Sequence, residues 1–248
     1  MTDHINRRRW LLGSAGLAGA LAGCGGGIDD DVRLRAVNAT EDIDSIDIDY
    51  NDWTFAFDVR QGGDVTSYAQ RQVLVIGAFG LFEVFRARDS LRLYDDNRSL
   101  PEGDTASVVV MGGRDAGIRL RLLDEDADPP FNGDRLRLRV LHALPGVGAL
   151  DVHLTAADTP LAGRGADWAL DGYDELSAFV ERPAGSAATR LRVTRRGDTS
   201  AVLFDNRSFD PNGGSAGALV LAPGAGSQRI AVTALPHGGT GRRYSNGG

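Results

Sequence analysis

The chain has 248 residues, of which 42% are hydrophobic and 25% are charged, and this composition is typical of a globular protein. Its 27 basic residues are all arginine and are outnumbered by 34 acidic residues, and the net charge of −7 argues against nucleic acid as a partner. A single cysteine excludes an intrachain disulfide, and four histidines leave little material for a histidine-rich metal site.

Residues 1–23 have the pattern of a cleaved signal peptide. Arg7-Arg8-Arg9 precedes an apolar run over residues 10–22, which is too short to span a bilayer as a helix. The run leads directly to the lone cysteine. Leu21-Ala22-Gly23-Cys24 resembles the lipobox of bacterial lipoproteins, in which the thiol is lipidated and the chain is cut before the cysteine. The resemblance implies a lipid anchor on Cys24.

The same segment indicates a destination. Residues 7–11 are similar to a twin-arginine export signal, with the general secretory route as the alternative. Gly25 follows the cysteine, and in Gram-negative lipoproteins a residue other than aspartate at this place permits passage to the outer membrane. Loss of residues 1–23 removes three arginines and Asp3, which takes the net charge from −7 to −9. We expect a bacterial cell-envelope protein anchored in the outer membrane, with residues 24–30 as a tether.

An internal repeat organises the rest of the chain. Residues 33–39 align with 137–143, and residues 45–49 with 149–153, both at an offset of 104. Asp-Asn-Arg-Ser at 96–99 recurs identically at 205–208, an offset of 109, so the second copy has gained five residues in a loop. The repeat predicts two tandem domains, residues 31–123 and 135–237.

Within each copy the apolar residues recur with a period of two. Arginines alternate with aliphatic residues over 32–36 and 135–140, which predicts strands with one solvated face. Residues 105–111 and 217–221 are almost continuously apolar, as expected of strands buried on both faces. About seven short strands in each copy predict an all-β fold of two tandem immunoglobulin-like antiparallel β-sandwich domains.

Two segments look different from the repeats. Residues 124–134 combine a charged run with Pro129-Pro130, and we expect an exposed, semi-rigid linker. Residues 238–248 are polar and rich in glycine, which predicts a disordered tail.

The second copy resembles the bacterial family known as domain of unknown function 4397. The resemblance rests on the strand ending in His142-Ala143, the Leu-Asp-Val strand at 150–152, and residues 179–185, which lead into Pro-Ala-Gly. It covers most of 135–235 and, more loosely, 31–123, where Asn38 replaces the histidine. The resemblance implies a β-sandwich in a secreted or envelope-anchored protein and implies no known chemistry.

Two motifs raise the question of catalysis or metal binding. Residues 213–217 match the G-x-S-x-G pattern of hydrolases, but a turn leads here into an apolar run, so we predict a glycine-rich hairpin. Asp124, Asp126 and Asp128 alternate in the linker like the start of a calcium-binding loop. The pattern fails where Pro129 and Arg135 replace the required glycine and glutamate, so solvated acidic residues are the favoured interpretation and a calcium site is the alternative.

Three further features have a structural and a functional interpretation. His142 and Asp151 are either an acid–base pair or, as favoured, separate structural side chains. The repeated Asp-Asn-Arg-Ser segments favour turns, with an anion site as the alternative. Trp53 and Trp168 are expected in the cores, with a sugar-stacking platform as the alternative.

Together these features predict a non-enzymatic binding or structural module that needs no cofactor. Its expected partners are the membrane, through the lipid anchor, and an envelope glycan or protein. The alternative function is an envelope carbohydrate-active hydrolase with two paired carboxylates, whose separation cannot be derived from sequence.

Overall fold

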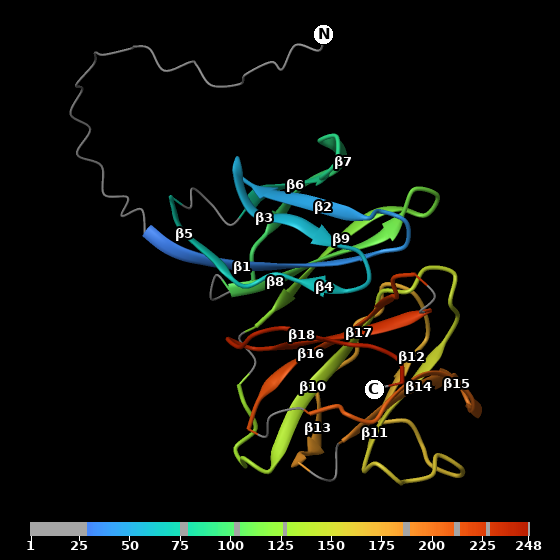
Figure 1. Ribbon diagram of the computed structural model, residues 1–248. Helices are drawn as coiled ribbons and strands as arrows, with labels where there is room; N and C mark the ends of the chain where they lie inside the picture. The colour runs from blue at the N-terminus through green and yellow to red at the C-terminus, as the bar shows by residue number, and fades with distance from the viewer. Residues whose placement is uncertain are drawn as a thin grey trace, which may run out of the picture.

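The computed structural model describes residues 29–74, 79–101, 105–125, 128–185, 189–210, 214–226 and 229–247. Regular structure in these segments consists of eighteen β-strands in four sheets, which confirms the predicted all-β fold (Figure 1). The described segments contain no helix that is long and apolar enough to cross a membrane.

The first half of the chain forms two sheets, which we call A and B. Sheet A has the order β4-β1-β8-β9, with β5 also pairing with β1, and contains β1 (Asp29–Thr40), β4 (Asp64–Val65), β5 (Ala69–Leu74), β8 (Thr105–Gly113) and β9 (Gly117–Asp124). Sheet B has the order β3-β2-β6-β7 and contains β2 (Ser45–Tyr50), β3 (Trp53–Arg60), β6 (Phe79–Arg86) and β7 (Leu91–Ser99).

The second half forms sheets C and D. Sheet C has the order β13-β10-β16-β17-β18 and contains β10 (Arg135–His142), β13 (Val180–Pro183), β16 (Ala216–Pro223), β17 (Ile230–Pro236) and β18 (Arg242–Tyr244). Sheet D has the order β12-β11-β14-β15 and contains β11 (Leu150–Thr155), β12 (Trp168–Leu170), β14 (Arg190–Arg195) and β15 (Asp198–Asn206).

The two halves share the order of their main strands, in agreement with the sequence repeat: β1-β8-β9 corresponds to β10-β16-β17, and sheet B has the same order as sheet D. In each, the first strand pairs parallel with a later strand: Leu34 lies opposite Ala106 between β1 and β8, and Leu138 lies opposite Gly217 between β10 and β16. The other pairs of strands are antiparallel. Positions in one half therefore have structural equivalents in the other.

The four sheets stack in the order B, A, C, D (Figure 1). One hydrophobic cluster fills the space between B and A and another the space between C and D, as in β-sandwiches. A third cluster joins A to C and so joins the two halves. Its buried members are Val37, Ala39, Val109, Met111, Leu123, Leu141, Ala143, Ala218, Val220, Ala222 and Leu235.

Contact between A and C explains the continuous apolar runs. β8 contributes Val108 and Val110 to the core of the first half and Val109 and Met111 to the contact between the halves. β16 is buried on both faces in the same way. The prediction of strands buried on both faces is therefore confirmed.

The same contact corrects one expectation and limits another. Arg35 was expected on a solvated face, yet it is fully buried, because the outer face of sheet A packs against sheet C. Most described residues of the linker are exposed, as expected, but Glu125 and Pro130 are buried. The Arg35 guanidinium lies 3.0 Å from the Glu125 carboxylate, so this pair neutralises the charge that the contact between the halves encloses.

The C-terminal tail also differs from its expectation. Residues 242–244 form β18, which pairs antiparallel with β17. Tyr244 is buried, and its ring centroid lies 4.9 Å from that of Phe209. Burial of this aromatic ring explains why a polar, glycine-rich segment is ordered up to residue 247.

Candidate functional site

Two of the predicted site residues, Cys24 and Asp126, lie outside the described residues. Lipidation of Cys24 therefore stays a prediction. Asp124 ends β9, and its backbone oxygen accepts a hydrogen bond from Arg139. The backbone oxygen of Asp128 lies 3.4 Å from Nη1 of Arg137. Within the described segments, no group of three or more His, Cys, Asp or Glu side chains is placed to hold a metal ion.

Glu125 is the acidic residue of the linker with the most contacts. One carboxylate oxygen accepts from Nε of Arg35 at 3.1 Å and from the Ser107 hydroxyl at 2.5 Å. The other accepts from the Tyr68 hydroxyl and from the Gly238 amide at 3.4 Å. Burial and the bond to Glu125 raise the pKa of Tyr68. This cluster ties the linker to both halves, which is a structural role.

Paired arginines stack on one aromatic ring in each half. Arg33 and Arg35 lie over the ring of Tyr68, at 4.9 and 4.6 Å from its centroid. Their equivalents Arg137 and Arg139 lie over Phe179, at 5.2 and 4.6 Å. The repeated arginines that sequence analysis placed in solvent are thus partly covered by an aromatic side chain.

The structure separates His142 from Asp151. His142 is fully buried; its Nδ1 accepts from the Leu144 amide at 3.3 Å, so Nε2 carries the hydrogen and donates to the Gly148 carbonyl at 3.1 Å. Asp151 accepts from the Gly197 amide at 2.8 Å and lies 3.4 Å from Nε of Arg196. Both side chains have backbone partners, as the structural interpretation predicts.

The repeated Asp-Asn-Arg-Ser segments lie at equivalent places, at the ends of β7 and β15. Asp96 pairs with Arg98 at 2.9 Å, whereas Asp205 pairs with Arg190 at 2.6 Å. Because β7 belongs to sheet B and β15 to sheet D, the two segments lie in the outermost layers and do not form one paired anion site.

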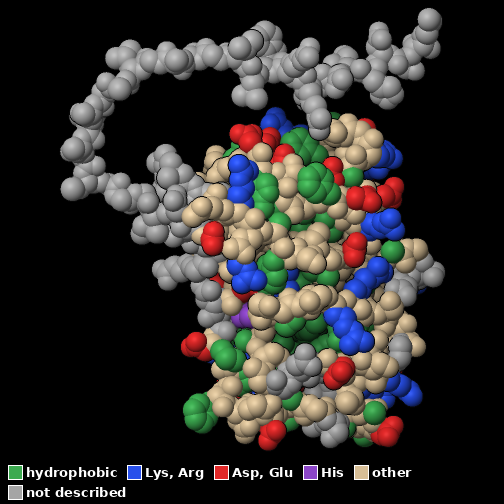
Figure 2. Space-filling model, turned by 60° about the vertical axis from the view of Figure 1, so that its left-hand side comes forward, with side chains coloured by type: hydrophobic (Ala, Val, Ile, Leu, Met, Phe, Trp, Pro, Cys, Tyr) green, Lys and Arg blue, Asp and Glu red, His purple; other side chains and the backbone are tan. Residues whose placement is uncertain are grey.

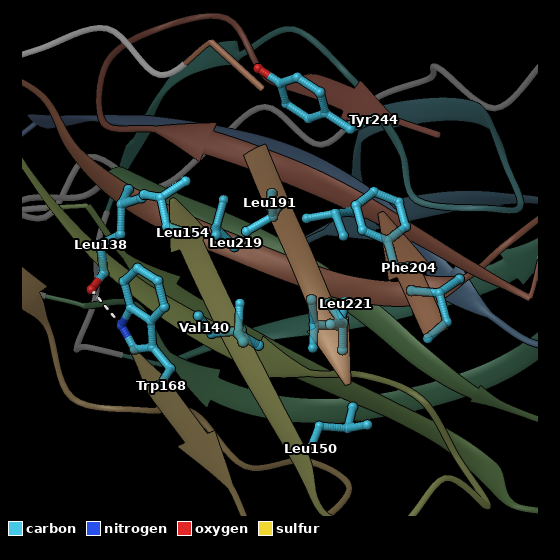
Figure 3. Close-up of a cluster of buried hydrophobic side chains, with 14 of the residues drawn as sticks. Leu138, Val140, Leu150, Leu154, Trp168, Leu191, Phe204, Leu219, Leu221 and Tyr244 are labelled. Carbon is cyan, nitrogen blue, oxygen red and sulfur yellow. Dashed lines mark hydrogen bonds between the residues drawn. The ribbon is translucent and has the colours of Figure 1, made fainter. Parts of the chain in front are cut away.

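Trp168 lies in the core of the second half, as expected. Its indole N–H donates to the Leu138 carbonyl at 3.2 Å (Figure 3). Trp53 is partly buried against the core of the first half, so neither ring offers an open stacking platform. Ser215 of the G-x-S-x-G motif directly precedes β16, in agreement with a turn that enters a strand.

The outer face of sheet B is a candidate binding surface among the described residues. Asp49, Glu83 and Asp95 lie opposite one another on β2, β6 and β7 and form an acidic row. In the next row, Asp47 on β2 lies opposite Phe85 on β6. The amide of Asp58 on β3 donates a hydrogen bond to the Asp47 carboxylate, so the neighbouring Phe57 lies beside this row. Phe57 is 69% exposed. Figure 2 shows hydrophobic side chains among charged ones at this end of the molecule.

Sheet D presents different chemistry at the equivalent place. His153 and Arg192 lie opposite each other, where sheet B has Asp49 and Glu83. The β11–β12 connection, residues 156–167, covers them: Arg192 donates to the Thr159 carbonyl at 2.7 Å, and Arg190 to the Ala157 carbonyl at 2.9 Å. His153 is 1% exposed and Arg192 is 4% exposed.

Turn length explains this difference in cover. β2 and β3 are joined by Asn51 and Asp52, both with positive φ, which is typical of a tight type I′ hairpin turn. The corresponding connection in the second half is long enough to fold back over sheet D. Sequence analysis missed the contrast, although the offsets of 104 and 109 already align Asp49 with His153 and Glu83 with Arg192.

The sheet B face does not have the form of a glycosidase site. Asp49 and Glu83 lie on an open sheet rather than across a cleft, and Glu83 is held by Arg92 at 3.1 Å. Two pockets of the described residues are lined by one carboxylate each, Asp210 and Asp205. Within the described residues, none of these places sets two carboxylates across a cleft, as a glycosidase needs.

The sequence matches no protein-family model and no curated protein. The resemblance of the second half to domain of unknown function 4397 therefore stays a prediction.

Proposed function

We propose that the chain is a lipid-anchored cell-envelope protein with two tandem immunoglobulin-like domains, which binds a protein partner through the outer face of sheet B without catalysing a reaction. Cys24 carries the anchor, and Gly25 favours the outer membrane. The support for the domains is the repeated strand order, with two stacked sheets and one core in each half.

The binding role rests on one observation: among the described residues, the outer face of sheet B is open, whereas the outer faces of sheets A and C are covered and that of sheet D is covered in part. Sheets A and C cover each other, and residues 156–167 cover part of sheet D. The open face combines the exposed Phe57 with the acidic row of Asp49, Glu83 and Asp95. Arg92 is the arginine that pairs with both Glu83 and Asp95, so the row of three carboxylates keeps a net negative charge. Apolar contacts beside such a row fit a protein surface that presents basic groups around an apolar centre.

The anchor is tested by changing the proposed lipidated thiol. Cys24→Ser removes the nucleophile and should release the protein from sedimented membranes into the soluble fraction. A protein that sediments equally well with and without Cys24 would rule out the anchor.

The binding face is tested with the soluble Cys24→Ser protein. We expect it to sediment with outer-membrane vesicles in a saturable, salt-sensitive way, and to lose this binding after the vesicles are treated with protease. Asp49→Asn with Glu83→Gln should weaken binding, because the acidic row loses two charges. Binding to purified peptidoglycan instead would identify a glycan partner and overturn the protein partner.

A matched control removes the same charge elsewhere. Asp171 and Glu181 are exposed acidic residues of the second half. Asp171→Asn with Glu181→Gln should leave vesicle binding unchanged. Equal losses in the two double variants would show that net charge, rather than the sheet B face, governs the association.

A further inference from the structure

A pocket opens between the strands of sheet C and the segment that follows β15. Its volume is about 150 Å³, and its apolar walls include Leu138, Phe209, Leu219, Ala234 and Tyr244. Leu138, Leu219 and Tyr244 come from β10, β16 and β18 and are labelled in Figure 3. The pocket thus reaches the hydrophobic core of the second half, to which Leu138, Phe209, Leu219 and Tyr244 belong.

The repeat explains why space is left at this place. Leu219 on β16 lies opposite Ala234 on β17, and the equivalent pair in the first half is Val108 opposite Leu122. Leu122 packs against the core of the first half. An alanine at the equivalent place has a much smaller side chain, so the second half has a hollow where the first half has a leucine.

The rim of the pocket is polar, while its interior is apolar. Asp210, Ser215, Thr240 and Arg242 lie around the hydrophobic walls. The Arg242 guanidinium lies 5.1 Å from the centroid of the Tyr244 ring, and Tyr244 in turn contacts Phe209. Two aromatic rings therefore form one side of the pocket, and a cation lies at its entrance.

We propose that this pocket binds a small apolar molecule with the size of a single aromatic ring. An enclosed protein cavity of about 150 Å³ with aliphatic and aromatic walls accepts benzene, and this pocket has a similar volume and similar walls below its polar rim. Burial of such a ligand would restore contacts that the lining side chains lack. The pocket belongs to the second half, so the inference stands whether or not the sheet B face binds a partner.

The test uses toluene as the probe and the whole protein carrying Cys24→Ser. We expect saturable binding, seen as a concentration-dependent rise in Tm and as NMR contacts from toluene protons to the methyl groups of Leu138 and Leu219. Ala234→Leu places the first-half residue in the pocket and should abolish both signals. The matched control Ala169→Leu makes the same change at an exposed position of β12 and should bind like the original protein.

Three outcomes would overturn the proposal. These are no saturable binding of toluene by the original protein, equal binding by Ala234→Leu, and NMR contacts to methyl groups elsewhere in place of those of Leu138 and Leu219. The NMR contacts need no variant, so the result does not depend on whether Ala234→Leu folds.

A second experiment uses benzoate in place of toluene and tests the rim of the pocket. Tighter binding that is lost in Arg242→Gln would extend the ligand class to aromatic acids, and weaker binding would restrict it to neutral molecules.

Discussion

Asn38 and His142 occupy equivalent positions in the two halves, and different side chains there make similar hydrogen bonds to the turn that follows; Asn38 also donates to the Val59 carbonyl at 2.9 Å. Asn38 accepts from the Thr40 amide at 3.1 Å and donates to the Ile43 carbonyl at 3.2 Å. His142 accepts from the Leu144 amide at 3.3 Å and contacts the Gly148 carbonyl at 3.1 Å. In each half, one buried side chain therefore supplies an acceptor and a donor to the turn that follows the first strand.

This equivalence predicts how His142 tolerates substitution. His142→Ala leaves the buried Leu144 amide without its side-chain partner, so the free energy of unfolding should fall by about 1–3 kcal/mol. His142→Asn should lose less, because asparagine performs this role in the first half. Urea unfolding of both variants checks the order. Equal losses would show that the ring is needed for packing rather than for its hydrogen bonds.

Removal of the buried charge of Glu125 should destabilise the whole molecule. Glu125→Gln leaves the guanidinium of Arg35 buried without a negative partner, and loss of one member of a buried ion pair costs about 3–5 kcal/mol. Because the pair lies at the contact between the halves, both halves should unfold in a single transition at lower urea concentration. Tryptophan fluorescence of Trp53 and Trp168 reports on the two halves together.

Two controls separate charge from packing at this place. Arg35→Met with Glu125→Met removes both charges and should be less harmful than Glu125→Gln alone. Asp58→Asn breaks a pair with Arg60 in which both side chains are well exposed, and this change should cost almost nothing. A Glu125→Gln protein as stable as the Asp58→Asn protein would contradict the structural role of Glu125.

Acidification should weaken the second half through His153. Burial lowers the pKa of His153, and the positive charges of Arg192 and Arg164 lower it further. The negative charges of Asp151 and Asp167 act in the opposite direction but are outweighed. The folded protein therefore binds a proton on this ring less readily than the unfolded chain, in which histidine has its ordinary pKa of about 6.5. The contribution of His153 to stability is therefore complete above that value and is lost as the pH falls below it.

The measurement is the free energy of unfolding at about pH 7.5 and at about pH 5.5. Both pH values lie above the ordinary pKa values of aspartate and glutamate, so these side chains stay ionised. His153→Gln should reduce the loss of stability between these two pH values. NMR titration of the His153 ring in the folded protein gives an independent check. A ring that titrates at or above its ordinary value would refute the prediction.

Calcium should have little effect on stability. The backbone oxygens of Asp124 and Asp128 already face arginine donors, which would repel a cation. We expect the same Tm in millimolar calcium and in chelator. A rise of several degrees with calcium would revive the site that includes Asp126.

Much of the architecture could be derived from the sequence because the repeat and the period-two pattern are local signals. The continuous apolar run of β8 even predicted burial on both faces. The partner for its second face could not be derived, since alternation of arginine with aliphatic residues around Arg35 looks the same whether the arginines face water or another sheet. Tyr244 was missed for a similar reason: a single buried ring orders a segment whose average composition is polar.

The candidate sites were less predictable than the fold. The contrast between Asp49 and His153 could have been found by extending the alignment of the repeats, because it needs no coordinates. The pocket beside Ala234 could not have been found from the sequence. The register between β16 and β17 decides which residue of the first half is equivalent to Ala234, and this register is known only from the structure. For the G-x-S-x-G motif, local context correctly predicted that a turn leads into a strand, since β16 begins at Ala216.

The contact between sheets A and C has a mechanical consequence. The two halves share a cluster of buried side chains, which includes Val37 and Leu235, and a buried ion pair. The two domains are therefore not free to move independently of each other. The outer faces of sheets B and D are held at a fixed separation and point in opposite directions (Figure 1). Any two components that engage these faces would be held apart at a constant distance, as by a rigid spacer.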